Sequence, residues 1–127
     1  MDPAAQLTLY VAEGDRVPPS QPHAQGQLLY QALIEAAQQT GLVGVTVMRS
    51  AVSYSQRYPH ICVDWIMEFA PHQIVVLTLI DQPAVIARYL PRVKALIHAG
   101  LATQDAVTVV HHAPLSSELT SSVPVPQ

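Results

Sequence analysis

The stretch GLVGVTVMR, residues Gly41–Arg49, marks a change from helix to strand. Before it, one continuous apolar face is formed by residues at helical spacing, namely Leu28, Leu29, Ala32, Leu33, Ala36 and Ala37. Gly41 follows the last of them, and a glycine there is typical of the left-handed residue that ends a helix. Val45, Thr46 and Val47 are then β-branched residues that favour extended backbone. We therefore predict a helix over residues 25–40 and a strand over Val43–Ser53.

Three further strands and one further helix flank this stretch. The runs rich in β-forming residues are Leu7–Ala12, Gln73–Asp81 and Asp105–His112. Between the last two, residues 82–100 carry apolar side chains at helical spacing and end in a glycine. The order is strand, helix, strand, strand, helix, strand, which predicts an α+β, ferredoxin-like βαββαβ fold. Such a fold has a four-stranded antiparallel sheet with two helices on one face.

Two of the predicted connections are long. Residues 17–26 contain three prolines and read as a surface loop. Residues 53–72 join the second and third strands and include tyrosines, a tryptophan and mixed charges. Loops longer than about 12 to 15 residues in a compact domain are usually functional or disordered. Part of the second connection alternates in polarity, so we expect it to extend the two strands into a long hairpin.

The composition favours a single domain that assembles with copies of itself. The chain has 127 residues, half of them hydrophobic and only 12% charged, with a net charge of −3. The charged fraction is about half of that usual in soluble proteins, and two helices can cover only one face of the sheet. A homo-oligomer would bury the other face. The net negative charge disfavours binding to a nucleic acid polymer.

The remaining compositional features concern location and domain limits. The apolar runs are too short for a membrane helix, and the N-terminus lacks the basic start of a secretory signal. Cys62 is the only cysteine, which fits a reducing compartment, so we expect a cytoplasmic protein without membrane insertion. Residues 1–112 form the predicted domain. Residues 113–127 form a polar, proline-bearing tail.

Three segments resemble a known family. They are LTLYVAEGDR (7–16), GQLLYQALIEAAQQTGLVGVTVMR (26–49) and IVVLTLID (74–81). Their most specific part is Leu-Tyr before the first helix, followed by Gly-Leu-x-Gly-x-Thr-Val-x-Arg. Together they resemble the PII-like proteins of the family called domain of unknown function 190. The resemblance implies a ferredoxin-like fold, a homotrimer, a T-loop between strands two and three, and regulation rather than catalysis.

The chain departs from the pattern of that family at four places. It inserts VPPSQPHAQ before the first helix, where the family has a short connection with a basic residue and a proline. Residues 50–55 replace a glycine-rich run, and residues 60–63 replace an arginine-isoleucine-histidine-threonine signature. The turn after the second helix, AGLATQD, lacks the glycine- and lysine-bearing nucleotide loop of true PII proteins.

The candidate ligand-binding residues are three arginines and two tyrosines. Arg49 lies toward the end of the second predicted strand, where PII-like trimers form a cleft between subunits, and Arg57 and Arg16 are the further cations. The arginine fork suits phosphate or carboxylate. Tyr54 and Tyr58 could stack on a base, so an adenine nucleotide is one candidate ligand. Alternatively, the arginines form surface or intersubunit ion pairs, and the aromatic residues contact a neighbouring chain.

Metal binding and catalysis have weaker support in the sequence. His60, Cys62 and His72, or the pair His111 and His112, contain metal-ligating groups, but adjacent residues on a strand point to opposite faces. Motifs of hydrolases, zinc proteases, P-loops and Cys-x-x-Cys redox sites are absent. Acylphosphatases share the predicted topology and need an asparagine, which this chain lacks entirely. We therefore predict no catalytic residue and no dedicated metal site.

The hypothesis that follows is a trimeric PII-like regulatory protein. It would bind a small anionic ligand between subunits and engage a regulated partner, such as a membrane transporter or an enzyme, through its long loop. Two alternatives stay open: a scaffold trimer without a ligand, and a metal-binding CutA-like protein.

Overall fold

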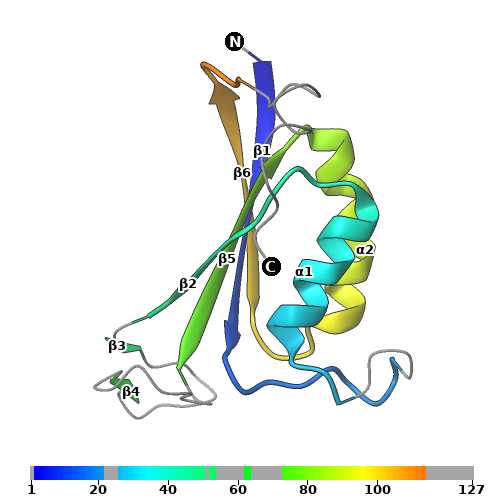
Figure 1. Ribbon diagram of the computed structural model, residues 1–127, viewed down its shortest axis with the longest axis vertical. Coiled ribbons are helices and arrows are strands. Elements are labelled where there is room, and N and C mark those ends of the chain that lie inside the picture. The colour runs from blue at the N-terminus through cyan, green and yellow to red at the C-terminus, as the bar shows by residue number, and fades with distance from the viewer. Residues whose placement is uncertain (1, 22–25, 51, 54–61, 64–72, 114–127) are drawn as a thin grey trace, which may run out of the picture.

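The structure of the protein, a computed structural model, describes residues 2–21, 26–50, 52–53, 62–63 and 73–113. Its main elements, in chain order, are β1 (Asp2–Ala12), α1 (Leu29–Thr40), β2 (Thr46–Arg49), β5 (Ile74–Asp81), α2 (Pro83–Leu96) and β6 (Leu101–Val109). The main sheet has the strand order β2-β5-β1-β6, and every neighbouring pair is antiparallel. This arrangement confirms the predicted ferredoxin-like βαββαβ fold (Figure 1).

Both helices lie side by side on one face of the sheet (Figure 1). The core lies between the sheet and the helices. Its large side chains that are 0% exposed are Leu9, Leu33, Leu77, Ile86 and Tyr89. Full burial of one large apolar side chain stabilises a fold by about 1.5–3 kcal/mol. The alternation along the strands explains the core, because Leu7, Leu9 and Val11 all face the helices.

Tyr89 joins the two helices inside this core. Its hydroxyl donates a hydrogen bond of 2.7 Å to the backbone carbonyl of Leu33. Burial raises the pKa of Tyr89 above its ordinary value of 10.0, although the nearby Arg92 cation partly offsets the rise. The phenol is therefore held in its neutral form.

The opposite face of the sheet has no described helix over it. Directly opposed residues of antiparallel strands share a face, so the register gives a row of threonines across all four strands: Thr46, Thr78, Thr8 and Thr103. The next row contains Met48, Val76, Tyr10 and Leu101. Met48 is 62% exposed and Leu101 is 56% exposed. We call this surface the open face.

The first helix ends as predicted but begins later. Gly41 has φ 94°, in the left-handed region, and its N–H bonds to the carbonyls near the end of α1 at 3.1 Å. The predicted start at residue 25 is wrong, since α1 begins at Leu29. A backbone bridge between Arg16 and Leu28, with a 2.9 Å bond from Val17 N to Gln27 O, keeps the preceding residues extended.

The predicted strand limits also need correction. β1 begins at Asp2 rather than Leu7, because β6 pairs with it from that residue onward. β2 covers only Thr46–Arg49 of the predicted Val43–Ser53. At the start of the predicted strand, the N–H of Val43 donates to the Asp81 side chain at 3.1 Å instead of pairing with the backbone of β5.

The last strand begins and ends earlier in the chain than predicted. β6 runs from Leu101 to Val109, whereas the sequence predicted Asp105–His112. Its limits follow from the register, because Leu101 pairs with Tyr10 near the end of β1, and Val109 pairs with Asp2 at its beginning. Beyond Val109 the described part of β1 offers no further partner.

Most of the predicted long hairpin lies outside the described residues. Two short strands, β3 (Val52–Ser53) and β4 (Cys62–Val63), pair with each other in a separate two-stranded sheet. The predicted tail lies outside the described residues from 114 onward. Within the described ranges, no helix is long and apolar enough to cross a membrane.

Candidate functional site

The topology gathers three separate parts of the chain at one corner of the sheet. β1 and β2 both run antiparallel to β5, which lies between them, so both end where β5 begins. Glu13 directly follows β1, Arg49 ends β2, and Gln73 directly precedes β5. We call Glu13, Arg49, Ser50 and Gln73 the Arg49 corner.

An ion pair forms the centre of the Arg49 corner. The Nη2 atom of Arg49 donates to Oε2 of Glu13 at 3.2 Å, and Nε of the same guanidinium lies against Oε1. The first contact is a hydrogen bond and the second an ion pair. A hydrogen bond between charged groups is about twice as strong as one between neutral groups. The Glu13 side chain is only 7% exposed, whereas that of Arg49 is 26% exposed. The pair is thus buried on the glutamate side and accessible on the arginine side.

Ser50 is fixed to the start of β5 immediately after this pair. Its N–H and its hydroxyl both donate to the carbonyl of Ile74, at 2.9 and 2.8 Å. The Nε2 atom of Gln73 donates to the Ser50 carbonyl, and the Gln73 carbonyl accepts a 2.8 Å bond from the N–H of Glu13. The backbone that leaves β2 is therefore held firmly at Ser50.

Gln73 contributes one further polar atom to the Arg49 corner. The residue is 1% exposed, and its Oε1 atom is buried without a hydrogen-bond partner in the described part of the chain. A buried acceptor left unsatisfied costs about 1–3 kcal/mol. Among the residues that the structure describes, the hydrogen bonding of this corner is therefore incomplete.

The other predicted cation has a different partner. The Nη1 atom of Arg16 donates to the carbonyl of Gly26 at 2.8 Å and closes the base of the inserted loop. The structure thus pairs Arg49 with Glu13 and directs Arg16 to the loop. The other predicted site residues, Tyr54, Arg57 and Tyr58, lie outside the described residues.

Sequence reasoning identified Arg49 but missed Glu13 and Gln73. A usable signal existed, because the predicted topology brings the ends of strands one and two to the same end of the sheet. An acidic residue directly after the first strand and an arginine near the end of the second are then natural partners.

The residues considered for a metal site are only partly described. His111 and His112 follow β6 and are exposed. His60, His72 and the Cys62 side chain lie outside the part of the chain whose side chains are described. Among the side chains that the structure describes, no three His, Cys, Asp or Glu residues gather where they could hold a metal ion.

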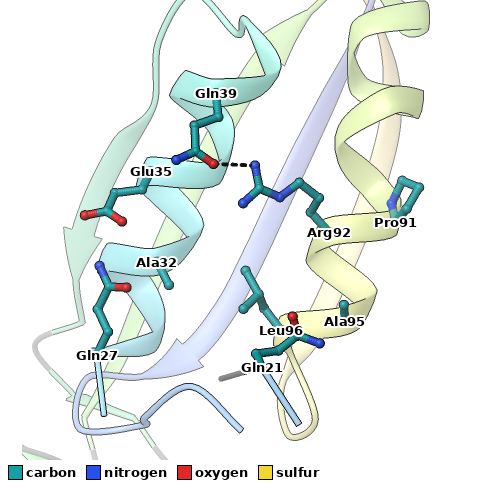
Figure 2. Close-up of a pocket in the computed structure, with 9 residues that line it drawn as sticks. All are labelled: Gln21, Gln27, Ala32, Glu35, Gln39, Pro91, Arg92, Ala95 and Leu96. Atoms are coloured by element: carbon teal, nitrogen blue, oxygen red, sulfur yellow. Dashed lines mark hydrogen bonds between the residues drawn. The ribbon is translucent and has the colours of Figure 1, made fainter. Parts of the chain in front are cut away.

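A hollow lies between the two helices and the inserted loop, with a volume of about 390 Å³. It is bordered by α1, α2 and the inserted loop, and its lining residues are Gln21, Gln27, Ala32, Glu35, Gln39, Pro91, Arg92, Ala95 and Leu96. Figure 2 shows that Arg92 reaches toward α1, where its Nη1 donates to Oε1 of Gln39 at 2.7 Å, while Glu35 points away from it. No sequence motif indicated this groove. Its arginine, Arg92, already donates a hydrogen bond to Gln39 on the opposite helix.

Comparison with solved structures gives several proteins of the same fold. A protein from Thermus thermophilus, described as PII-like and signalling, superposes with a TM-score of 0.56 at 23% identity, over 87% of this chain and 94% of that one. The nitrogen regulatory PII-like protein CPII from Thiomonas intermedia, bound to ADP, AMP and bicarbonate, superposes with a TM-score of 0.55 at 10% identity. That match covers 87% of this chain and 91% of the other.

Comparison with sequences identifies the family itself. No curated protein matches the chain. A family model does match, over residues 4–109, and its description is an uncharacterised ACR. These residues span both helices and nearly the whole of the main sheet. The chain therefore belongs to the family called domain of unknown function 190, as the resemblance predicted, and it shares its fold with the PII-like proteins named above.

Proposed function

We propose that this protein is a trimeric PII-like regulatory protein that binds a small anionic ligand beside Arg49. The observation that carries the proposal is the position of this arginine. Arg49 is the last residue of β2, its side chain is partly exposed, and the long connection to β5 begins directly after it. A planar guanidinium suits bidentate recognition of phosphate or carboxylate. A ligand bound there would touch the base of that connection.

The open face supports the homotrimer. Met48, Ile80 and Leu101 are large apolar residues of the sheet, exposed by 62, 43 and 56%. Met48 and Leu101 belong to an apolar row that crosses all four strands through Val76 and Tyr10. An exposed apolar row of this kind supports an interaction site. A closed ring of three chains would cover it and bring a neighbouring chain close to the Arg49 corner.

The ligand class follows from the chemistry of the site together with the relatives. The structure of CPII contains ADP, AMP and bicarbonate, and all three are small anions. For this chain we propose an adenine nucleotide or a comparable anion, held by Arg49 with Arg16, Arg57, Tyr54 and Tyr58. The segment between β2 and β5 would engage the regulated partner, a transporter or an enzyme, in the cytoplasm. The role is regulatory, without a catalytic residue.

One observation favours the second candidate, a scaffold trimer without a ligand. Arg49 is already paired with Glu13, and Arg16 already bonds to Gly26. Cations with internal partners are also what a purely structural arrangement would contain.

Calorimetry with a panel of ADP, AMP, ATP, cyclic nucleotides and bicarbonate separates the two candidates. We expect heat of binding for at least one member, together with a rise in Tm. Arg49→Lys keeps the charge opposite Glu13 but loses the fork, so affinity should fall by about tenfold, which corresponds to about 1.4 kcal/mol. Arg88→Lys, at an exposed position of α2, is the matched control and should bind like the wild type. No heat and no change in Tm with any compound would favour the scaffold.

A further inference from the structure

The Arg49 corner contains its own anion. Glu13 supplies a carboxylate to the same guanidinium that an external anion would need, and it does so through two contacts. An anionic ligand and Glu13 would therefore compete for the same donor atoms of Arg49.

The side chains of Glu13 and Arg49 differ in their exposure to solvent. The Glu13 side chain is 7% exposed, so its charge lies on the protein side of the guanidinium, while Arg49 is open to solvent on the other side. A ligand that approached from solvent would meet a guanidinium already neutralised, with a second negative charge directly behind it. Repulsion between like charges is strong where water is largely excluded.

The backbone at Glu13 would not have to move for the carboxylate to leave. Its N–H is bonded to the Gln73 carbonyl at 2.8 Å, and this bond is independent of the side chain. Rotation of the Glu13 side chain would break both of its contacts with Arg49 and leave this backbone bond in place.

Gln73 gives an independent indication that the corner is not a finished structural network. Its buried Oε1 has no hydrogen-bond partner among the described residues. Buried polar groups beside a structural ion pair normally have hydrogen-bond partners. An incoming group with an O–H or N–H donor would complete this acceptor.

We propose that Glu13 is a built-in competitor for Arg49, which sets the affinity of the site for anions and must be displaced when one binds. The inference rests on the function proposed above, because it requires that Arg49 bind an anion. The ligand class it implies is an oxyanion able to replace a carboxylate on an arginine fork, such as a diphosphate.

The test is a titration of ADP and of inorganic pyrophosphate into three full-length proteins, followed by calorimetry. Glu13→Gln removes the competing charge while it keeps the shape of the side chain, so both probes should bind at least about tenfold more tightly than to the wild type. Glu35→Gln removes one negative charge from an exposed position of α1 and should leave both affinities unchanged. This control separates local competition from a change in net charge.

Two results would overturn the inference in distinguishable ways. If the wild type binds a probe and Glu13→Gln binds it equally or more weakly, Glu13 is not a competitor, while the proposed function stands. If none of the three proteins binds either probe, the ligand site itself is wrong, and the proposed function falls with the inference. Binding to Glu13→Gln alone would support the inference strongly.

A second variant protects the test against a folding defect. Glu13→Asp keeps the charge but shortens the reach to Arg49, so it should bind the probes more tightly than the wild type and less tightly than Glu13→Gln. Tm measured without ligand shows whether each variant is folded. A folded Glu13→Asp protein with wild-type or weaker affinity contradicts the proposal.

Discussion

The two faces of the main sheet come from the same strands yet differ in the exposure of several large apolar residues. On the helix side, Leu9 and Leu77 are fully buried, whereas Met48 and Leu101 on the open face are more than half exposed. Alternation along a strand sends neighbouring residues to opposite faces. The two helices cover one face within a single chain, and we propose that another chain covers the other face. If so, stability and assembly depend on alternate residues of the same strands.

The largest expected effect comes from opening the covered face. Leu33 of α1 is 0% exposed. Leu33→Ala leaves a cavity between the helix and the sheet and should lower the free energy of unfolding by about 2–5 kcal/mol. Urea unfolding followed by circular dichroism measures the difference. A loss below about 0.5 kcal/mol, the size usual for surface substitutions, would show that α1 does not seal this face.

A smaller effect is expected where the helices are tied together. Tyr89→Phe removes the hydrogen bond to the Leu33 carbonyl, whose net contribution should be about 0.5–1.5 kcal/mol. The same urea experiment at neutral pH detects it. Equal stability of the two proteins would mean that packing alone holds α2 on α1.

The same tyrosine predicts a pH dependence. Burial raises the pKa of Tyr89 above the ordinary value of 10.0 that applies in the unfolded chain. Above that value the unfolded state loses the proton while the folded state keeps it, so the free energy of unfolding should fall as pH rises further. Below it this contribution is fully present. Tyr89→Phe should show a shallower alkaline loss than the wild type, and identical slopes would contradict the assignment.

The open face should respond in assembly rather than in folding. Met48→Lys places a charge at an exposed position, so the free energy of unfolding of a single subunit should change by about 0.5 kcal/mol or less. Light scattering should give about three times the 13.8 kDa chain mass for the wild type and a lower mass for the variant. Gln31→Lys, at an exposed position of α1, is the control and should keep the wild-type mass. A wild-type monomer at micromolar concentration would rule out the trimer.

The smallest effect is expected from the tail. Residues 114–127 show no apolar periodicity, so their removal should leave Tm almost unchanged. A large fall in Tm would indicate that the tail covers part of a sheet or a neighbouring chain. The tail would then help to cover the sheet, in addition to the two helices and a neighbouring chain.

The sequence was sufficient for the order of the elements and for the end of the first helix. Helical and strand periods are local properties, and Gly41 marks the helix end by itself. The strand limits depend instead on pairing between distant residues. β6 begins at Leu101 because Tyr10 of β1 lies opposite it, although the polar residues that follow Leu101 look unlike a strand.

Of the candidate site, the sequence predicts Arg49 but not its partners, because the partners also depend on pairing between distant residues. Arg49 stands out in the sequence because it ends a strand and carries a charge in a chain with few charges. Its partner Glu13 lies far away in the chain and meets it only through two separate pairings with β5. The buried amide of Gln73 carries no charge and belongs to no motif, so only the folded structure reveals it.

The pairing of Asp2 with Val109 brings the first and last residues of the main sheet into neighbouring strands. Strands in a sheet are about 4.8 Å apart, so a short peptide linker could join these two positions without disturbing a hydrogen bond of the ladder. New termini could then be placed in the inserted loop near the exposed Ser20, where they would interrupt neither a helix nor a strand. Such a circular permutant would begin with α1 and end with β1. The order of the elements along the chain and their arrangement in the sheet are therefore separable properties of this fold.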